Sequence, residues 1–155
     1  MNKTVRGRGA TINSENPFSL HDYATEHIEG LDEEFILDEK TQYLLEFPKK
    51  VVNKVDSPDI GMFYSLNPYQ GCEHGCIYCY ARNTHHYWGL SAGLDFEQKI
   101  LVKPDAPRLL KEMISKKNWE VQPISLSGNT DCYQPAERKF RITRQLLEVL
   151  NQYRH

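Results

Sequence analysis

The run Gly71-Cys72-Glu73-His74-Gly75-Cys76-Ile77-Tyr78-Cys79-Tyr80 decides the interpretation of this chain, because it holds three of the four cysteines. Spacers of three and then two residues separate Cys72, Cys76 and Cys79. Thiolates are soft ligands, and three of them on one tight loop can each bind a different iron of a cubane iron-sulfur cluster. The sequence therefore predicts a cluster in which one iron has no protein ligand and is open to chemistry.

Other interpretations use the same residues. A Cys-x-x-Cys pair, a further cysteine and a nearby histidine (His74, His85 or His86) can form a closed tetrahedral zinc site. A disulfide framework is disfavoured, because the cysteines are sparse and we expect no hydrophobic secretory leader. Three unrelated buried thiols would not explain why the cysteines fall within eight residues. The zinc site remains an open alternative.

The cysteine spacing, with the aromatic Tyr78 just before the last cysteine, closely resembles the signature of the radical S-adenosylmethionine (radical SAM) superfamily. The resemblance implies that Cys72, Cys76 and Cys79 bind a 4Fe-4S cluster and that Tyr78 lies beside the adenine of S-adenosylmethionine. It implies that the open iron binds this cofactor and that one electron cleaves it to a 5'-deoxyadenosyl radical, which abstracts hydrogen. An electron donor such as flavodoxin or ferredoxin would then be a partner.

The segment Ser127-Gly128-Asn129-Thr130-Asp131 follows a predicted strand. It is similar in placement to the Gly-Gly-Glu-like turn with which radical SAM enzymes contact the methionine amino group. The resemblance therefore implies four further cofactor-binding residues: Gly128, Asn129, Thr130 and Asp131. The alternative is an ordinary turn, in which Asn and Asp satisfy local backbone groups.

Three segments together resemble bacterial proteins related to spore photoproduct lyase, which often carry a DNA repair photolyase label by similarity. These segments are residues 65–72, 78–82 and 128–138. The resemblance implies DNA or another nucleic acid as a candidate substrate. The Arg6-Gly-Arg8-Gly run also fits one branch of this group, and alone it is consistent with a nucleic-acid-binding tail or, as we favour, a disordered terminus.

The chain divides at about residue 60. We expect residues 1–60 to be an irregular N-terminal extension, which includes an acidic stretch over residues 22–39. After Gly61 the pattern predicts strands over residues 62–66, 99–102 and 121–127. It predicts helices that start at Asp105 and that cover residues 138–152. Alternation of strands and helices indicates an α/β fold with parallel pairing, and the first strand delivers the cysteine loop.

The resemblance makes residues 61–155 the N-terminal part of a partial (β/α) barrel of the radical SAM type. A β/α unit takes about 30 residues, so only the first two or three of six units are present. We therefore expect an N-terminal fragment, or a C-terminal barrel half supplied in trans. A non-catalytic truncated remnant is a further alternative.

Several other residues have two interpretations. Cys132 is a candidate fourth ligand or a radical-quenching thiol, but a small structural residue is the favoured interpretation, because a fourth thiolate would close the open iron. Adjacent histidines point in different directions, so packing or surface roles are favoured for His85 and His86. Arg82 and Tyr87 are weaker candidates for lining the site.

Composition indicates a cytoplasmic protein. No apolar stretch approaches the roughly 20 residues that span a bilayer, so we expect no membrane partner. Basic residues are concentrated after Lys103, which fits an anionic partner or, as we favour, the solvated faces of helices.

Overall fold

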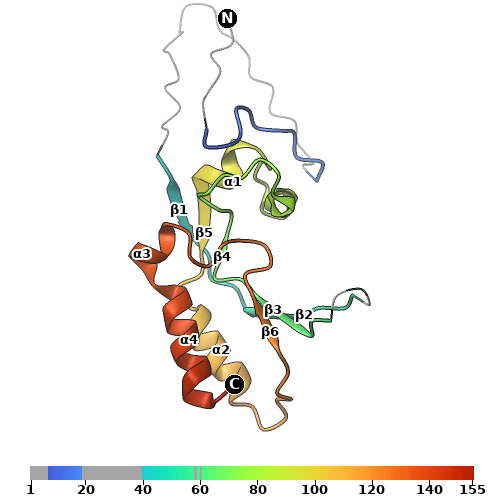
Figure 1. Cartoon of the computed structure of the whole chain (residues 1–155), viewed down its shortest axis with the longest axis vertical. Helices are drawn as coiled ribbons and strands as arrows, with labels where there is room; N and C mark the ends of the chain where they lie inside the picture. The colour runs from blue at the N-terminus through green and yellow to red at the C-terminus, as the bar shows by residue number, and fades with distance from the viewer. Residues whose placement is uncertain (1–6, 19–39, 58, 60) are drawn as a thin grey trace, which may run out of the picture.

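The computed structural model describes residues 7–18, 40–57, 59 and 61–155 (Figure 1). In chain order its elements are β1 (Gln42–Leu45), β2 (Val52–Lys54), β3 (Tyr64–Leu66), β4 (Tyr69–Gln70), the 3-10 helix η1 (Tyr80–Trp88), α1 (Leu94–Gln98), β5 (Lys99–Val102), α2 (Ala106–Ile114), β6 (Ile124–Leu126), α3 (Ala136–Phe140) and α4 (Ile142–Tyr153). The fold is therefore mixed α/β.

The described strands form two three-stranded sheets, ordered β1-β5-β4 and β2-β3-β6 (Figure 1). β1 pairs in parallel with β5, and β3 pairs in parallel with β6. The pairs β2–β3 and β4–β5 are antiparallel. Asn67-Pro68 separates β3 from β4, so the chain passes there from one sheet to the other. The cysteine loop then begins directly after β4.

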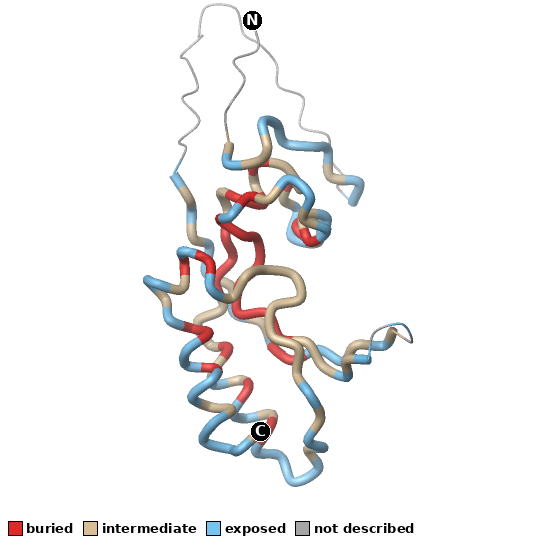
Figure 2. The backbone as a smooth tube through the Cα atoms, in the orientation of Figure 1, coloured by how far each residue is buried: buried red, intermediate tan, exposed pale blue. Residues whose placement is uncertain are grey.

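The hydrophobic core lies between the strands and the helix pair α2 and α4. Both helices turn apolar stripes inward, and their outer faces are exposed (Figure 2). The largest of the fully buried apolar side chains in this cluster come from both layers: Leu66, Tyr69, Ile100, Leu110, Ile142 and Leu146. The core thus fixes β4 and β5, the strands next to the cysteine loop.

Several sequence predictions are confirmed. β5 has the predicted bounds, and β3 lies within the predicted strand over residues 62–66. α2 begins directly after Asp105, with Pro107 in its first turn, and buries Leu110 and Ile114 of its apolar stripe. Parallel pairing is confirmed for β3 with β6. The partial barrel remains a prediction.

The expectation of an irregular region before residue 60 was wrong for two segments, because β1 and β2 are strands. β1 is mostly exposed and lacks a clear inward-outward alternation, so its sequence carries little strand signal. Its ordering comes from pairing with β5, which lies far along the chain. Arg6 and the acidic residues 22–39 lie outside the described residues.

The helix predicted over residues 138–152 was wrong at its start. Arg141 adopts a left-handed conformation with φ of 54°, which ends α3 and starts α4 as a separate helix. The apolar spacing continues across this break, so the pattern alone gave no sign of it. The strand predicted over residues 121–127 is shorter, since only Ile124–Leu126 pairs with β3.

The predicted solvated faces agree with the contacts on the helices. Arg108 pairs with Asp105 and Glu112, and Arg144 pairs with Glu148. Among the described residues, no helix is long and apolar enough to cross a membrane.

His85 is a buried part of η1, as the packing interpretation predicted. Its ring is fully buried and packs edge-on against Phe96 at 5.4 Å between centroids. Its Nε2 lies 3.0 Å from the carbonyl oxygen of Lys99. Burial disfavours the charged imidazolium and lowers the pKa of His85 to about 4.

Replacing Arg141 by glycine should raise the free energy of unfolding by about 0.5–1 kcal/mol. Relief of the left-handed conformation outweighs the greater backbone entropy that glycine loses on folding. The matched change Arg138→Gly, at an exposed position inside α3, should instead lower stability by about 1 kcal/mol. Urea unfolding measures the free energy of unfolding of both variants. Changes of the same sign would contradict the break assigned at Arg141.

His85 should make stability depend on pH. Its pKa is lowered on folding, from 6.5 to about 4, so the unfolded chain binds the proton more readily. Stability contributed by neutral His85 is complete above pH 6.5 and falls by about 3 kcal/mol as the pH drops to about 4. Urea unfolding of wild type and His85→Gln at several pH values isolates this component. If the free energy of unfolding changed equally with pH in wild type and His85→Gln, His85 would be protonated within the fold.

Candidate metal and cofactor site

One cavity brings together the two segments that the sequence singled out. Its volume is about 180 Å³. The cavity is lined by Cys72, His74, Cys76, Cys79, Tyr80, Ala81, Ser127, Gly128, Thr130 and Asp131. All three cysteines of the motif therefore face the same space as the turn after β6. The short pairing of β3 with β6 positions this turn, since Ser127 N–H continues the pairing by donating to Leu66 O at 2.8 Å.

The three thiols are free and differ in exposure. Cys72 is buried, whereas Cys76 and Cys79 are half-buried. Burial raises the pKa of the Cys72 thiol, because a thiolate loses hydration there. A cationic iron or zinc centre would offset this cost by stabilising the thiolate.

A first clamp holds the start of the cysteine loop from the side of the turn. Gln134 is fully buried, and its amide nitrogen donates to the carbonyl oxygen of Gly71 at 3.2 Å. Its side-chain oxygen accepts from the N–H of Glu73 at 3.0 Å. The Thr130 hydroxyl also donates to Gly71 O, at 2.6 Å. The clamp thus joins the backbone on both sides of Cys72 to the segment after β6.

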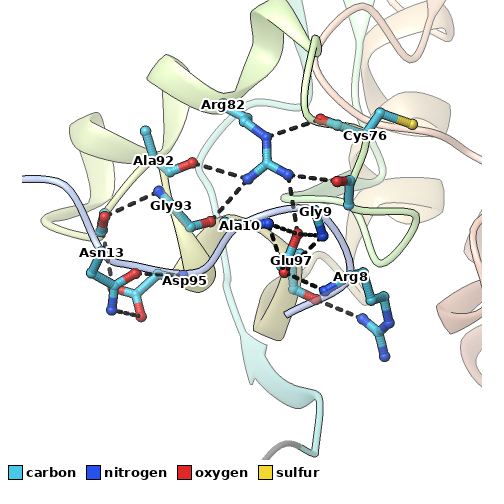
Figure 3. Close-up of polar contacts among 12 residues, drawn as sticks. Arg8, Gly9, Ala10, Asn13, Cys76, Arg82, Ala92, Gly93, Asp95 and Glu97 are labelled. Atoms are coloured by element: carbon cyan, nitrogen blue, oxygen red, sulfur yellow. Dashed lines mark hydrogen bonds and ion pairs between the residues drawn. The ribbon is translucent and has the colours of Figure 1, made fainter. Parts of the chain in front are cut away.

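A second clamp holds the middle of the loop. The Arg82 guanidinium donates to the carbonyl oxygens of Gly75 at 2.7 Å and Cys76 at 2.9 Å (Figure 3). It also forms an ion pair with Glu97 at 3.0 Å, with side chains 11% and 0% exposed respectively. A buried charge needs such pairing, because its desolvation is costly. Arg82 therefore fixes backbone oxygens and leaves the thiol of Cys76 uncommitted.

Two glycines make this loop path available. Gly71 and Gly75 have φ values of 82° and 64°, a region that other residues rarely adopt. A Cβ on Gly71 would also lie 2.8 Å from the carbonyl oxygen of Phe96. The glycines thus allow the turn and the close approach of the neighbouring chain.

The predicted cofactor-binding turn lies beside the cysteines, and its backbone is partly engaged already. The carbonyl oxygen of Gly128 accepts from the hydroxyl of Tyr80. The N–H of Asn129 donates to the side-chain oxygen of Asn67 at 2.9 Å. Gly128 lines the cavity, whereas Asn129 is not among the described lining residues.

The polar side chains of the turn also have protein partners. Thr130 donates to the cysteine loop, as described above. The Asp131 carboxylate accepts from the N–H of Tyr133 at 2.7 Å and lies 3.2 Å from Nε2 of His74. Both Asp131 and His74 are about half exposed, so this pair can rearrange at modest cost. The prediction that Thr130 and Asp131 bind the cofactor stays a prediction.

Tyr78, Cys132 and Tyr87 are not among the described residues that line the cavity. Tyr78 is 87% exposed and is not among the described lining residues. The neighbouring Tyr80 lines the cavity instead. Cys132 is half-buried and is likewise not among the described lining residues. Tyr87 is exposed and stacks on Phe18 at 5.4 Å between centroids.

Sequence reasoning missed three residues of the site. Gln134 and Glu97 look like ordinary surface polar residues in the sequence, and only burial reveals their role. Tyr80 could have been found from its position directly after Cys79. His74 was considered as a zinc ligand, and it does line the cavity with the cysteines. Within the described part of the chain, no three His, Cys, Asp or Glu side chains converge as a site for a single metal ion.

Comparison with known proteins finds partial relatives in bacteria and archaea. An uncharacterized protein of Mycobacterium tuberculosis is 34% identical over 103 residues, which are 66% of this chain and 30% of the relative. A Mycobacterium bovis protein matches to the same extent. An uncharacterized protein of Methanocaldococcus jannaschii is 32% identical over 108 residues, 66% of this chain and 36% of the relative.

The chain thus spans about a third of the length of the curated relatives it matches. No protein-family profile matches the chain, and no solved structure is a significant match. The names of these relatives state no activity.

Proposed function

We propose that this chain is a 4Fe-4S protein of the radical SAM type, with Cys72, Cys76 and Cys79 as cluster ligands. One observation carries the proposal: the three thiols and the turn at residues 127–131 line the same cavity, although they lie far apart in sequence. Three thiolates suit a cubane cluster that keeps one iron open. When bound, such a cluster supplies one electron for cleaving S-adenosylmethionine.

The protein's own residues would hold the loop rather than react. Arg82 and Gln134 bind backbone groups on the loop, so the thiols stay available as ligands. The carbonyl oxygen of Gly128 and the Asp131 carboxylate are acceptors beside the cysteines, which suits a ligand that carries an ammonium group. Tyr80, rather than Tyr78, is the aromatic side chain that lines the cavity.

The partners follow from this chemistry. The chain would need a low-potential electron donor such as flavodoxin or ferredoxin, and it would act in the cytoplasm. A nucleic-acid substrate and a C-terminal barrel half supplied in trans remain parts of the proposal that rest on the sequence resemblance.

Anaerobic reconstitution with iron and sulfide, followed by electron paramagnetic resonance of the reduced protein, tests the proposal. We expect a reduced-cluster signal that shifts when S-adenosylmethionine is added, because the ligand would bind the open iron. Replacing Cys72, Cys76 or Cys79 by Ala should each lower bound iron and sulfide at least about tenfold, since a direct ligand matters more than its outer-shell partners. Cys132→Ala is the matched control and should load like wild type.

Two results would contradict the proposal. Iron and sulfide that bind equally well to wild type and to the three cysteine variants would show adventitious loading. A cluster signal that does not shift when S-adenosylmethionine is added would show that the chain is an iron-sulfur protein without the proposed activity.

A zinc-binding module is the second candidate, because His74 lines the cavity with the three cysteines and zinc binds such Cys and His donors. The side chains would have to move together to bind one ion, since they do not converge among the described residues. His74→Ala separates the two candidates. A zinc site should lose its metal affinity by about tenfold or more in this variant, whereas a cluster with three cysteine ligands should load unchanged. Metal analysis of protein expressed with both metals supplied measures the outcome.

A further inference from the structure

Residues 7–10 are docked onto the fold by a buried carboxylate (Figure 3). Glu97, whose side chain is fully buried, accepts hydrogen bonds from the backbone N–H groups of Arg8 at 2.7 Å and Gly9 at 3.1 Å. The N–H of Ala10 lies 3.3 Å from the same carboxylate. The Arg8 guanidinium also donates to the backbone carbonyl of Glu97, at 2.8 Å. These residues are therefore part of the fold, contrary to the expected disordered terminus.

The docked segment continues onto the start of α1. The N–H of Leu94 donates to the carbonyl oxygen of Ile12 at 3.2 Å. Asn13 and Asp95 bond twice, since the N–H of Asp95 donates to the Asn13 side-chain oxygen at 2.9 Å and the Asn13 amide donates to the Asp95 carboxylate at 3.3 Å (Figure 3). Docking thus extends well beyond the Arg-Gly run.

The segment touches the cysteine loop backbone to backbone. A Cβ added to Gly9 would lie 1.8 Å from the carbonyl oxygen of Gly75, a separation that atoms cannot adopt. A Cβ on Gly75 would lie 2.5 Å from the Glu97 carboxylate and 2.7 Å from Cβ of Arg8. Glycine at both positions therefore permits the contact.

A chain of direct contacts leads from this segment to a cysteine. The carboxylate of Glu97 binds the segment on one side and the Arg82 guanidinium on the other. The same guanidinium holds the carbonyl oxygens of Gly75 and Cys76. Displacing the segment would expose the Glu97 carboxylate to water, which competes for it and screens its ion pair with Arg82. The hold of Arg82 on the loop would then loosen.

We propose that residues 7–10 form a strap that positions the cysteine loop, and Cys76 in particular, through Glu97 and Arg82. Its relevance to cluster binding rests on the function proposed above, whereas its effect on the loop does not. Residues 7–9 of the Arg-Gly run then support the cysteine loop instead of serving as a nucleic-acid-binding tail.

Gly9→Ala tests the strap, and Gly61→Ala is the matched control, because a Cβ on Gly61 meets no atom within 4 Å. The first readout is the alkylation rate of each thiol in the reduced, metal-free full chain, resolved by peptide mass spectrometry. We expect Gly9→Ala to speed alkylation of Cys76 roughly threefold or more through local opening, with Cys132 unchanged as internal reference. Gly61→Ala should match wild type at every thiol.

The second readout is the electron paramagnetic resonance spectrum of the reduced, reconstituted cluster. Gly9→Ala should alter its g values or lower its yield, whereas Gly61→Ala should not. A general loss of stability is tested by Leu146→Ala, which leaves a cavity in the core between α2 and α4, away from Glu97 and Arg82. This variant should not raise the alkylation rate of Cys76 as Gly9→Ala does. Equal rates and spectra for Gly9→Ala and wild type would overturn the strap.

A second variant keeps the test decisive if Gly9→Ala does not fold. Arg8→Ala removes the guanidinium bond to Glu97 and keeps the backbone contacts, so it should speed alkylation of Cys76 in the same direction by a smaller factor. If Arg8→Ala left the alkylation rate of Cys76 unchanged, the strap would be overturned. If wild type binds no cluster but the alkylation rates change as expected, the strap stands and the radical SAM proposal fails.

Discussion

The buried carboxylate of Glu97 is the interaction on which the cysteine site depends. A charge with no exposure to solvent must be satisfied by the protein, and here backbone N–H groups and one guanidinium do so. The donors come from two segments, residues 8–10 and the first turn of η1, and the carboxylate comes from a third, the end of α1. Because each donor is needed, the three segments are held together as one unit around the loop.

Both clamps on the loop act on its backbone. Arg82 holds carbonyl oxygens in the middle of the loop, and Gln134 holds a carbonyl and an N–H at its start. The side chains that face the cavity are therefore left for other partners. Because the clamps hold the backbone, a loop with few regular hydrogen bonds can keep three thiols in a defined arrangement. A cluster that contains several irons requires such an arrangement.

The sequence predicted the parts of the structure whose signal is local. The bounds of β5 and the start of α2 followed from an apolar run and a capping residue. The proximity of the cysteine loop to the turn after β6 was implied by the resemblance to the radical SAM superfamily. The strand β1 could not be predicted, because distant pairing and not its own pattern orders it. The roles of Glu97 and Gln134 were equally hidden, since a polar residue in a short helix or turn looks solvated until its burial is known.

The uneven exposure of the three thiols has a practical consequence for handling the protein. Cys72 is shielded from solvent, whereas Cys76 and Cys79 are open enough for a ligand to reach them. Molecular oxygen and peroxide use the same route, and accessible thiolates are the ones that oxidise to sulfenic and then sulfinic acid. Preparation in air would therefore oxidise Cys76 and Cys79 before the buried Cys72.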